Sequence, residues 1–173
     1  MPKPDMDKPI NLPKINFNHF LEKFPEVDLP ITLGEETHHV FSNQNDPLPV
    51  AMIEQFILPI EEEPADDYTE FVPCMKIANT GDFYAIIYWR AGLLNYQYRL
   101  ATFTKKGEYI DKRIIAGTFS DGEALTTSVA TIDEEWAIFV ASGRSGDSLL
   151  AYDAASSTAY QLELLPDGKI INS

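Results

Sequence analysis

The 173-residue sequence has a single cysteine, Cys74, which excludes an internal disulfide and any zinc site built from several cysteines. It is also poor in bases: 13 Lys and Arg stand against 27 Asp and Glu, a formal net charge of −14. Nucleic acids and anionic membrane surfaces are bound by clustered Lys and Arg, and here the bases are few and scattered. We therefore expect no nucleic-acid partner. Solubility is the simplest role for the charge, and a basic protein or a cation is the alternative.

Long apolar runs are absent as well. The segment Phe83 to Trp89 is among the longest, and it falls far short of the roughly 20 residues that span a membrane as a helix. We expect no membrane insertion. The first nine residues hold no apolar stretch of the kind found in signal peptides, which indicates a cytoplasmic protein. Apolar residues make up 45% of the chain, enough for a core, and the length suits one domain.

Proline and glycine divide the chain near residue 73. Eleven of the 12 prolines lie in residues 1–73, and eight of the nine glycines lie after residue 80. Proline interrupts helices and central strands, whereas glycine marks hairpin turns. We predict an extended flexible arm over residues 1–15 and a single domain over residues 16–173. Its residues 16–74 form a proline-rich, acidic, helical or irregular half, and its residues 75–173 form an antiparallel β half.

Two short helices are predicted before the sheet. The first is capped by Asn16, ends at Pro25, and has one apolar face made of Phe17, Phe20, Leu21 and Phe24. The second starts at Asp46-Pro47, since Asp is a good N-cap and Pro suits the first helical position. Its apolar face comprises Met52, Ile53, Phe56 and Ile57.

Strand signals follow from Met75 onward. Strands are predicted over residues 83–89, 96–104, 108–116, 126–132, 136–141, 149–153 and 159–165, with a last short strand after the turn at 166–169. Residues 84–87 resemble residues 136–139, which suggests two blade-like repeats of about 50 residues. Two blades cannot close a propeller. The predicted fold is therefore mainly β, an antiparallel β-meander or incomplete barrel with two short N-terminal helices.

No catalytic motif is present: the sequence has no nucleophile elbow, phosphate-binding loop, dinucleotide fingerprint or His-Glu-x-x-His pattern. No cofactor is implied, and an enzyme is not the favoured class. His38 and His39 follow Glu35-Glu36 and are the candidate metal ligands. Consecutive residues of a strand point to opposite faces, so only a turn could offer both imidazoles to one ion. The alternative is a polar surface segment.

The acidic segment is the most informative feature of the sequence. No Lys or Arg occurs between Lys23 and Lys76, while this stretch holds twelve acidic residues. A surface of one charge speeds association with a partner of the opposite charge. Tyr88, Trp89 and Tyr96 flank a nearby loop and add side chains typical of interfaces, although they also suit ordinary cross-strand pairs. The predicted partner-binding residues are Glu61, Glu62, Glu63, Asp66, Asp67, Glu70, Tyr88, Trp89 and Tyr96.

The segment Leu48-Pro49-x-x-Met52-x-x-x-Phe56, followed by an aromatic strand, resembles small acidic bacterial immunity proteins over about a dozen residues. It departs from their pattern at Leu58-Pro59-Ile60-Glu61, where a glycine pair is usual. We expect a non-enzymatic binding module that neutralises a basic partner protein. The alternatives are a metal- or small-ligand-binding protein or hydrolase with a sheet pocket near His38 and His39, and a structural subunit of a homo-oligomer.

Overall fold

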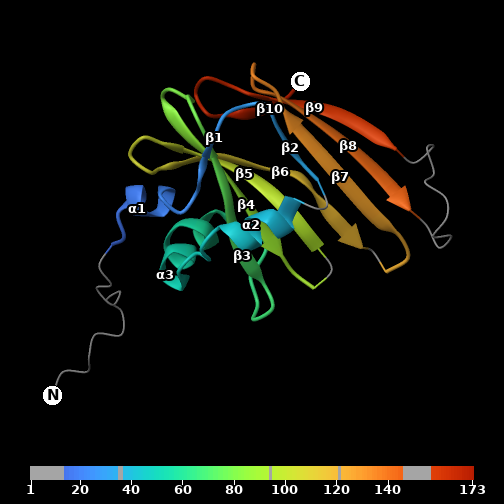
Figure 1. The fold of residues 1–173 in the computed structure, drawn as a ribbon, viewed down its shortest axis with the longest axis horizontal. Helices are drawn as coiled ribbons and strands as arrows, with labels where there is room; N and C mark the ends of the chain where they lie inside the picture. Colours follow the sequence, from blue (N-terminus) through green and yellow to red (C-terminus); the bar gives the residue numbers. More distant parts are fainter. Residues whose placement is uncertain (1–13, 35–36, 94, 121, 146–156) are drawn as a thin grey trace.

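A computed structural model describes residues 14–34, 37–93, 95–120, 122–145 and 157–173. These residues form one open, ten-stranded sheet with a few short helical segments, which confirms the predicted mainly β meander (Figure 1). The strands are β1 Glu26–Val27, β2 Ile31–Leu33, β3 Glu70–Ile77, β4 Phe83–Ala91, β5 Asn95–Thr104, β6 Tyr109–Ser120, β7 Leu125–Ile132, β8 Ala137–Ser145, β9 Thr158–Leu164 and β10 Ile170–Asn172. The helical segments are α1 Phe17–Leu21, α2 Thr37–Gln44, α3 Val50–Met52, the π-helical turn η1 Ile53–Ile57 and the 3₁₀ turn η2 Leu58–Ile60.

From β3 to β10 each strand pairs with the next in antiparallel fashion. The sheet curls because β6 leaves β7 part-way along. Only residues 117–120 of β6 pair with β7, and β2 pairs with residues 130–132 of β7 beyond that point. The far end of β6 lies instead beside β10, where the backbone N–H of Ile170 donates to Asp111 Oδ2 at 2.9 Å.

Two hydrophobic clusters occupy the two faces of the sheet. The larger cluster lies inside the curl and joins β3–β6 to β7–β10, with Leu100 and Ile138 fully buried and Cys74 1% exposed. The second cluster lies on the opposite face of β3–β5, beneath α1, α3, η1 and η2. There Phe20 is fully buried, and its ring stacks on Phe56 with centroids 4.6 Å apart.

The first predicted helix is present as α1, and Asn16 caps it by accepting a hydrogen bond from the Asn18 backbone N–H at 2.8 Å. The second predicted helix is present as α3 and η1 and begins at Val50, later than the predicted Asp46. Pro49 explains the shift, because a residue that precedes proline is disfavoured in the α conformation and Leu48 therefore cannot continue a helix from Pro47. Pro49 itself stands at the N-cap.

Helix α2 was not predicted, because its sequence Thr-His-His-Val-Phe-Ser-Asn-Gln lacks a broad apolar face. Tertiary contacts hold it in place. Thr37 Oγ1 lies 2.7 Å from the Tyr98 hydroxyl, and the Phe41 ring packs edge-on against Tyr98. Just after the helix, the Asn45 amide donates to the carbonyl oxygens of Pro73 and Cys74.

The suggested pair of blade-like repeats does not appear as two separate units. Strands β4 and β6 are separated by β5, whereas β8 pairs directly with β9. The sheet therefore has no place between β8 and β9 for a counterpart of β5. The strand predicted over residues 149–153, and most of the predicted arm of residues 1–15, lie outside the described residues.

Candidate interaction surface

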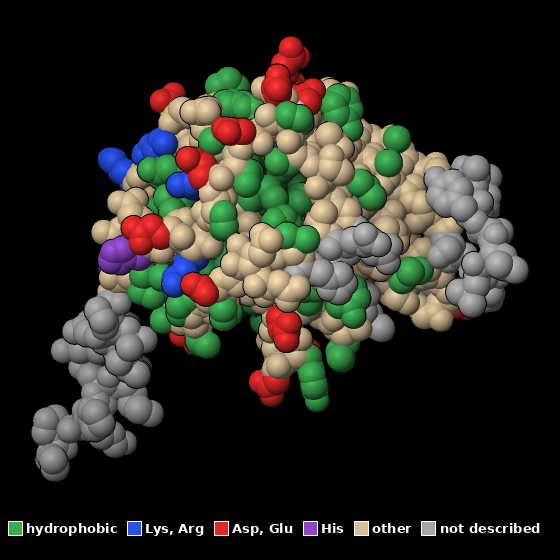
Figure 2. All heavy atoms as spheres, in the orientation of Figure 1, with side chains coloured by type: hydrophobic (Ala, Val, Ile, Leu, Met, Phe, Trp, Pro, Cys, Tyr) green, Lys and Arg blue, Asp and Glu red, His purple; other side chains and the backbone are tan. Residues whose placement is uncertain are grey.

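The acidic loop of residues 61–69 lies at one end of the sheet, together with the start of β3 and the turn between β4 and β5. The cross-strand pairs Glu70–Ala91 and Ala91–Tyr96 align these three strand ends. Figure 2 shows acidic and hydrophobic side chains gathered at the tip below β3. The fold thus collects part of the base-free stretch into one exposed region.

Glu61 anchors this loop, because its side chain is only 1% exposed. Its Oε2 accepts hydrogen bonds from the Tyr88 hydroxyl at 3.1 Å, from Lys112 Nζ at 3.0 Å and from Arg99 Nη1. Its Oε1 lies 3.2 Å from Arg90 Nε. A buried carboxylate needs such partners, since a buried charge left unpaired is costly.

The three cations come from three neighbouring strands: Arg90 from β4, Arg99 from β5 and Lys112 from β6. Their side chains are 7%, 2% and 8% exposed. We call Arg90, Arg99 and Lys112 the cation cluster. None of the three was identified from the sequence, because their convergence depends on the strand register. The one available signal is the presence of charged residues inside otherwise apolar or aromatic strand patterns.

The cation cluster also holds the backbone on either side of Glu61. Lys112 Nζ donates to the Ile60 carbonyl at 2.6 Å, and Arg90 Nη2 donates to the Pro64 carbonyl at 3.0 Å. Arg90 Nη1 adds a hydrogen bond to Glu63 Oε2 at 3.0 Å. These contacts fix residues 60–64 on the sheet and set where the rest of the loop projects.

Tyr88 completes the ring of donors around Glu61. Burial, together with the neighbouring Glu61 carboxylate, raises the pKa of the Tyr88 hydroxyl above its usual value near 10. The hydroxyl therefore stays protonated at neutral pH and serves as a donor to Glu61.

The predicted partner-binding residues fall into two groups. The side chains of Glu61, Tyr88 and Trp89 are buried or nearly so, which favours the cross-strand alternative for Tyr88 and Trp89: Glu61 and Tyr88 belong to the ion network, and Trp89 lies in the core cluster. The exposed members are Glu62, Glu63, Asp66, Asp67, Glu70 and Tyr96. We call these six residues the acidic end.

Two exposed hydrophobic side chains at the acidic end were missed. Tyr68 is 67% exposed and stands two residues before β3, and Leu93 is 69% exposed and stands two residues after β4. Tyr96, 42% exposed, stacks on Trp89 with ring centroids 5.7 Å apart. The acidic end therefore combines carboxylates with aromatic and aliphatic contacts, a composition suited to a protein interface.

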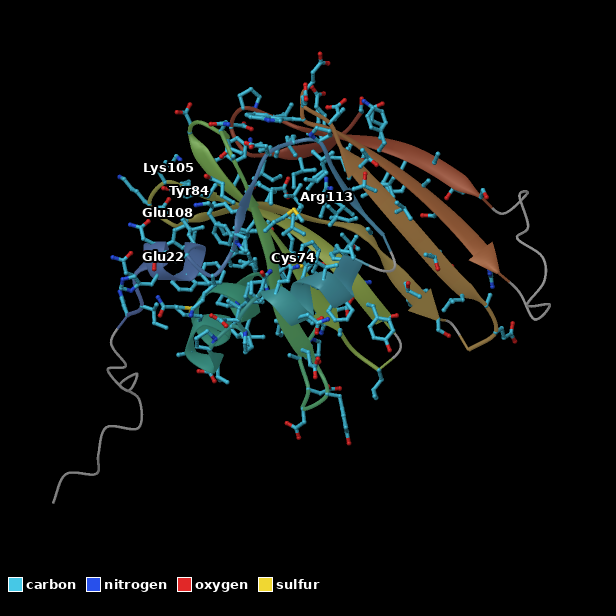
Figure 3. The ribbon with its side chains drawn as sticks, in the orientation of Figure 1. Glu22, Cys74, Tyr84, Lys105, Glu108 and Arg113 are labelled. Atoms are coloured by element: carbon cyan, nitrogen blue, oxygen red, sulfur yellow. The ribbon has the colours of Figure 1, made fainter. Side chains whose placement is uncertain are left out.

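Basic side chains gather elsewhere, around α1 and the β5–β6 hairpin (Figure 2). Lys105 Nζ lies over the Tyr84 ring, 3.9 Å from its centroid. Figure 3 shows Lys105 and Tyr84 in the same region as Glu22 and Glu108. Residues 104–109 form the opposite end of β5 and β6 from the turn near Tyr96, so charge is distributed unequally between the two ends of the sheet.

His38 and His39 lie within α2, a helix that was not predicted from the sequence. Their side chains lie outside what the structure describes, so the metal-binding prediction stays a prediction. Among the described residues, no group of three or more His, Cys, Asp and Glu is arranged to hold a metal ion.

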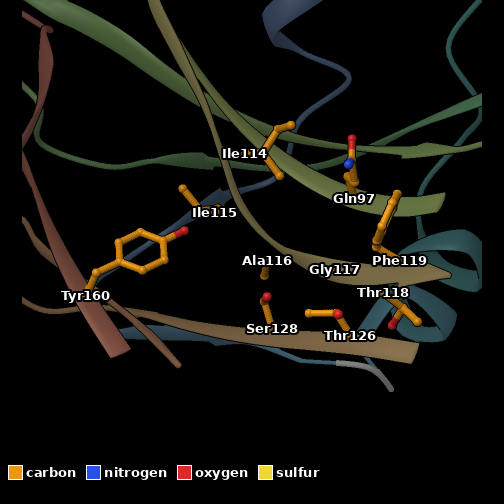
Figure 4. A pocket seen from close by; sticks show the side chains of 10 residues that line it. All are labelled: Gln97, Ile114, Ile115, Ala116, Gly117, Thr118, Phe119, Thr126, Ser128 and Tyr160. Atoms are coloured by element: carbon orange, nitrogen blue, oxygen red, sulfur yellow. The ribbon is translucent and has the colours of Figure 1, made fainter. Parts of the chain in front are cut away.

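A small hollow lies where β6 leaves β7 (Figure 4). It has a volume of ≈ 80 Å³ and includes neither histidine. Ile114 and Phe119 give it apolar walls, and Ser128 and Tyr160 add hydroxyl groups. The sheet pocket expected beside His38 and His39 stays a prediction, because the side chains of both histidines lie outside what the structure describes.

No family model matches the chain, and no curated protein or solved structure matches it either. The likeness to immunity proteins accordingly stays a similarity of local sequence pattern. Within the described residues, none of the helices has the length and apolar character needed to cross a membrane.

Proposed function

We propose that this protein is a non-enzymatic binding module that uses its acidic end to bind, and thereby neutralise, a basic partner protein. The observation that supports this most directly is the fixed presentation of exposed carboxylates beside exposed Tyr68, Leu93 and Tyr96. Carboxylates accelerate the encounter with a basic surface, and aromatic anchors supply contact area once the complex forms.

The anchoring of the loop strengthens the proposal. An acidic segment that is merely solvated has no need of three buried cations to hold its position, whereas a binding loop gains affinity from being ordered beforehand. Glu61 and the cation cluster provide that order, and residues 62–68 remain exposed. In this proposal Glu61 positions the surface and does not contact the partner.

A pull-down from source-cell lysate at low and high salt identifies the partner. We expect a basic protein that is retained at low salt and released at high salt, because exposed charges are screened within about 10 Å at 0.1 M ionic strength. A partner that is acidic, or whose retention is independent of salt, would contradict the proposal.

A charge-matched pair of variants then tests the surface. Asp66→Lys/Asp67→Lys changes the acidic end, and Glu134→Lys/Glu135→Lys makes the same change in net charge at the β7–β8 turn. We expect the first variant to slow association with the purified partner at least several-fold and the second to have little effect, as measured by stopped-flow. Equal slowing by both would show that only the net charge matters.

A further inference from the structure

The cation cluster holds more positive charge than its single buried carboxylate balances. Arg90, Arg99 and Lys112 carry three formal positive charges, and Glu61 supplies one negative charge. Glu63 adds a second carboxylate, 3.0 Å from Arg90 Nη1 and 4.0 Å from Arg99 Nη2, but its side chain is 53% exposed, and even with it one positive charge remains unbalanced. One cation would be enough to balance the charge of Glu61 in a structural ion pair. A structural ion pair alone therefore does not explain why three cations meet here.

Donor groups are in surplus as well. The buried Nε–H of Arg99 has no hydrogen-bond acceptor among the described residues, and the Nε–H of Arg90 lies 3.2 Å from Glu61 Oε1 without forming an aligned hydrogen bond to it. Buried polar atoms of this kind are uncommon and costly, and they cluster at functional sites. The carboxylate of Glu61 matches these donors poorly: the Tyr88 hydroxyl, Lys112 Nζ and Arg99 Nη1 all converge on its Oε2, while its Oε1 also has no aligned hydrogen bond among the described residues.

We propose that the cation cluster and Tyr88 form a binding site for a dianionic phosphate group, which Glu61 occupies as an internal substitute. A phosphate group carries a charge between −1.5 and −2 near neutral pH and offers three acceptor oxygens, so it matches the surplus of both charge and donors. Arginine side chains suit such oxyanions because their planar fork donates two parallel hydrogen bonds. This site adjoins the acidic end, since Glu63 contacts Arg90, but it binds a different ligand and goes beyond the proposed function.

The way the loop is attached provides the route for exchange. Residues 62–68 are exposed, and the polar contacts of residues 60–64 with the sheet run mainly through the same three cations. A phosphate group that binds Arg99 and Lys112 in place of Glu61 therefore removes the hydrogen bonds that hold the Glu61 side chain. The consequence is that binding of the phosphate group releases the loop that carries part of the acidic end.

The first test removes the internal substitute and uses inorganic phosphate as the probe. The melting temperatures of the wild type, Glu61→Ala and Glu62→Ala are followed against phosphate concentration at constant ionic strength, with sodium chloride and sodium acetate as comparisons. A ligand that binds the folded state raises the melting temperature in a saturable way. We expect phosphate to act on Glu61→Ala at a concentration at least tenfold lower than on the wild type and on Glu62→Ala.

Adding Arg99→Met to the Glu61→Ala background should abolish the phosphate effect. If Glu61→Ala does not fold, Glu61→Gln takes its place, because the amide keeps the size of the side chain and removes its charge. A phosphate effect no larger than that of chloride, or one that survives Arg99→Met, would overturn the proposal.

The second test asks whether phosphate displaces Glu61 in the wild-type protein, which a permanent structural ion pair would not allow. Amide hydrogen exchange of residues 62–69 is measured with increasing phosphate. We expect exchange to become several-fold faster in the wild type and to stay unchanged in Arg99→Met. No change at a hundredfold the concentration that saturates Glu61→Ala would show that Glu61 is a fixed structural partner. No partner protein is used, so the outcome is independent of the proposed function.

Discussion

Gly117 is the residue that permits the bend in β6. Its φ is +147°, and a Cβ at this position would lie 2.1 Å from the carbonyl oxygen of Tyr96. The residue pairs with Gln97 on one side and Ser128 on the other, and it is the first residue of β6 that pairs with β7 while β6 continues to pair with β5. Only a residue without a side chain fits between these backbones.

We therefore predict that Gly117→Ala lowers the free energy of unfolding by about 2–4 kcal/mol, because the new methyl group collides with backbone that cannot move aside. Gly122→Ala is the matched control. Its φ is also positive, at +93°, but a Cβ there meets no atom within 4 Å, so we expect a loss of about 1 kcal/mol. Urea unfolding measures both. Equal losses would refute the role assigned to the close approach.

For individual residues, the sequence predicted the exposed carboxylates of the acidic end better than the buried Glu61 that anchors the loop. The exposed carboxylates were predicted because an unbroken run of acids without bases is visible in the sequence itself. The burial of Glu61 was not, because nothing in the run Glu61-Glu62-Glu63 distinguishes one residue from the next. Its partners Arg99 and Lys112 are 38 and 51 residues away along the chain, and only the folded sheet brings them together.

Among the helical segments, α1 has the clearest energetic role because it supplies Phe20 to the second cluster. The Phe20 ring packs against Phe24, Phe56 and Phe103 with centroid distances of 5.1, 4.6 and 6.4 Å. Residues 17–21 form only five residues of helix, too few to be stable alone. The helix therefore depends on these ring contacts.

We expect Phe20→Ala to cost about 3–5 kcal/mol, the usual loss for truncating a buried aromatic residue. Phe119→Ala removes the same atoms from a side chain that is 46% exposed, and it should cost less than about 1 kcal/mol. Denaturant unfolding of both variants, with circular dichroism as the signal, gives the two values. A similar loss from both would mean that α1 does not contribute to the core as described.

How well each element could be predicted depends on whether its pattern is local. The spacing of Phe17, Phe20, Leu21 and Phe24 marks α1, and the alternating or aromatic strands β4 to β7 carry their own signals. Helix α2 has no such pattern, and its position depends on Asn45 and Tyr98, which contact distant parts of the chain. Proline was a poor guide to both helix boundaries: α1 ends at Leu21, four residues before the predicted end at Pro25, and the next predicted helix starts at Val50 instead of Asp46-Pro47 because Pro49 moves its start.

For the whole molecule, the antiparallel meander could be predicted from the sequence, whereas the curling of the sheet could not. Consecutive hairpins follow from turn residues between strand patterns, and this gave the order β4 to β8. Two pairings cross that order: β1 runs parallel to β3, and β2 pairs with β7 about 100 residues later. The second pairing is possible because β6 pairs with β7 only over residues 117–120, which leaves residues 130–132 of β7 to pair with β2.

The whole molecule also carries a prediction about alkaline pH. Burial raises the pKa of Tyr88 and of Tyr98 in the folded state, with Glu61 adding to the effect at Tyr88, whereas an unfolded tyrosine titrates near 10. Above pH 10 the folded state thus retains the hydroxyl protons of Tyr88 and Tyr98, which the unfolded chain releases. The stabilisation is complete below pH 10 and is lost as the pH rises toward the folded pKa values, by about 1.4 kcal/mol per pH unit for each of the two tyrosines.

We therefore expect the free energy of unfolding to stay nearly constant between pH 8 and 9.5 and to fall steeply above about pH 10, as the net charge of −14 grows and adds repulsion. Urea unfolding at each pH measures this, and absorbance near 295 nm counts the ionised tyrosines. Tyr98→Phe should reduce the slope above pH 10, although it also removes the hydrogen bond to Thr37. If all eight tyrosines ionise near pH 10 while the protein stays folded, Tyr88 cannot be the buried, protonated donor that holds Glu61. The anchoring of the acidic loop would then rest on the three cations alone.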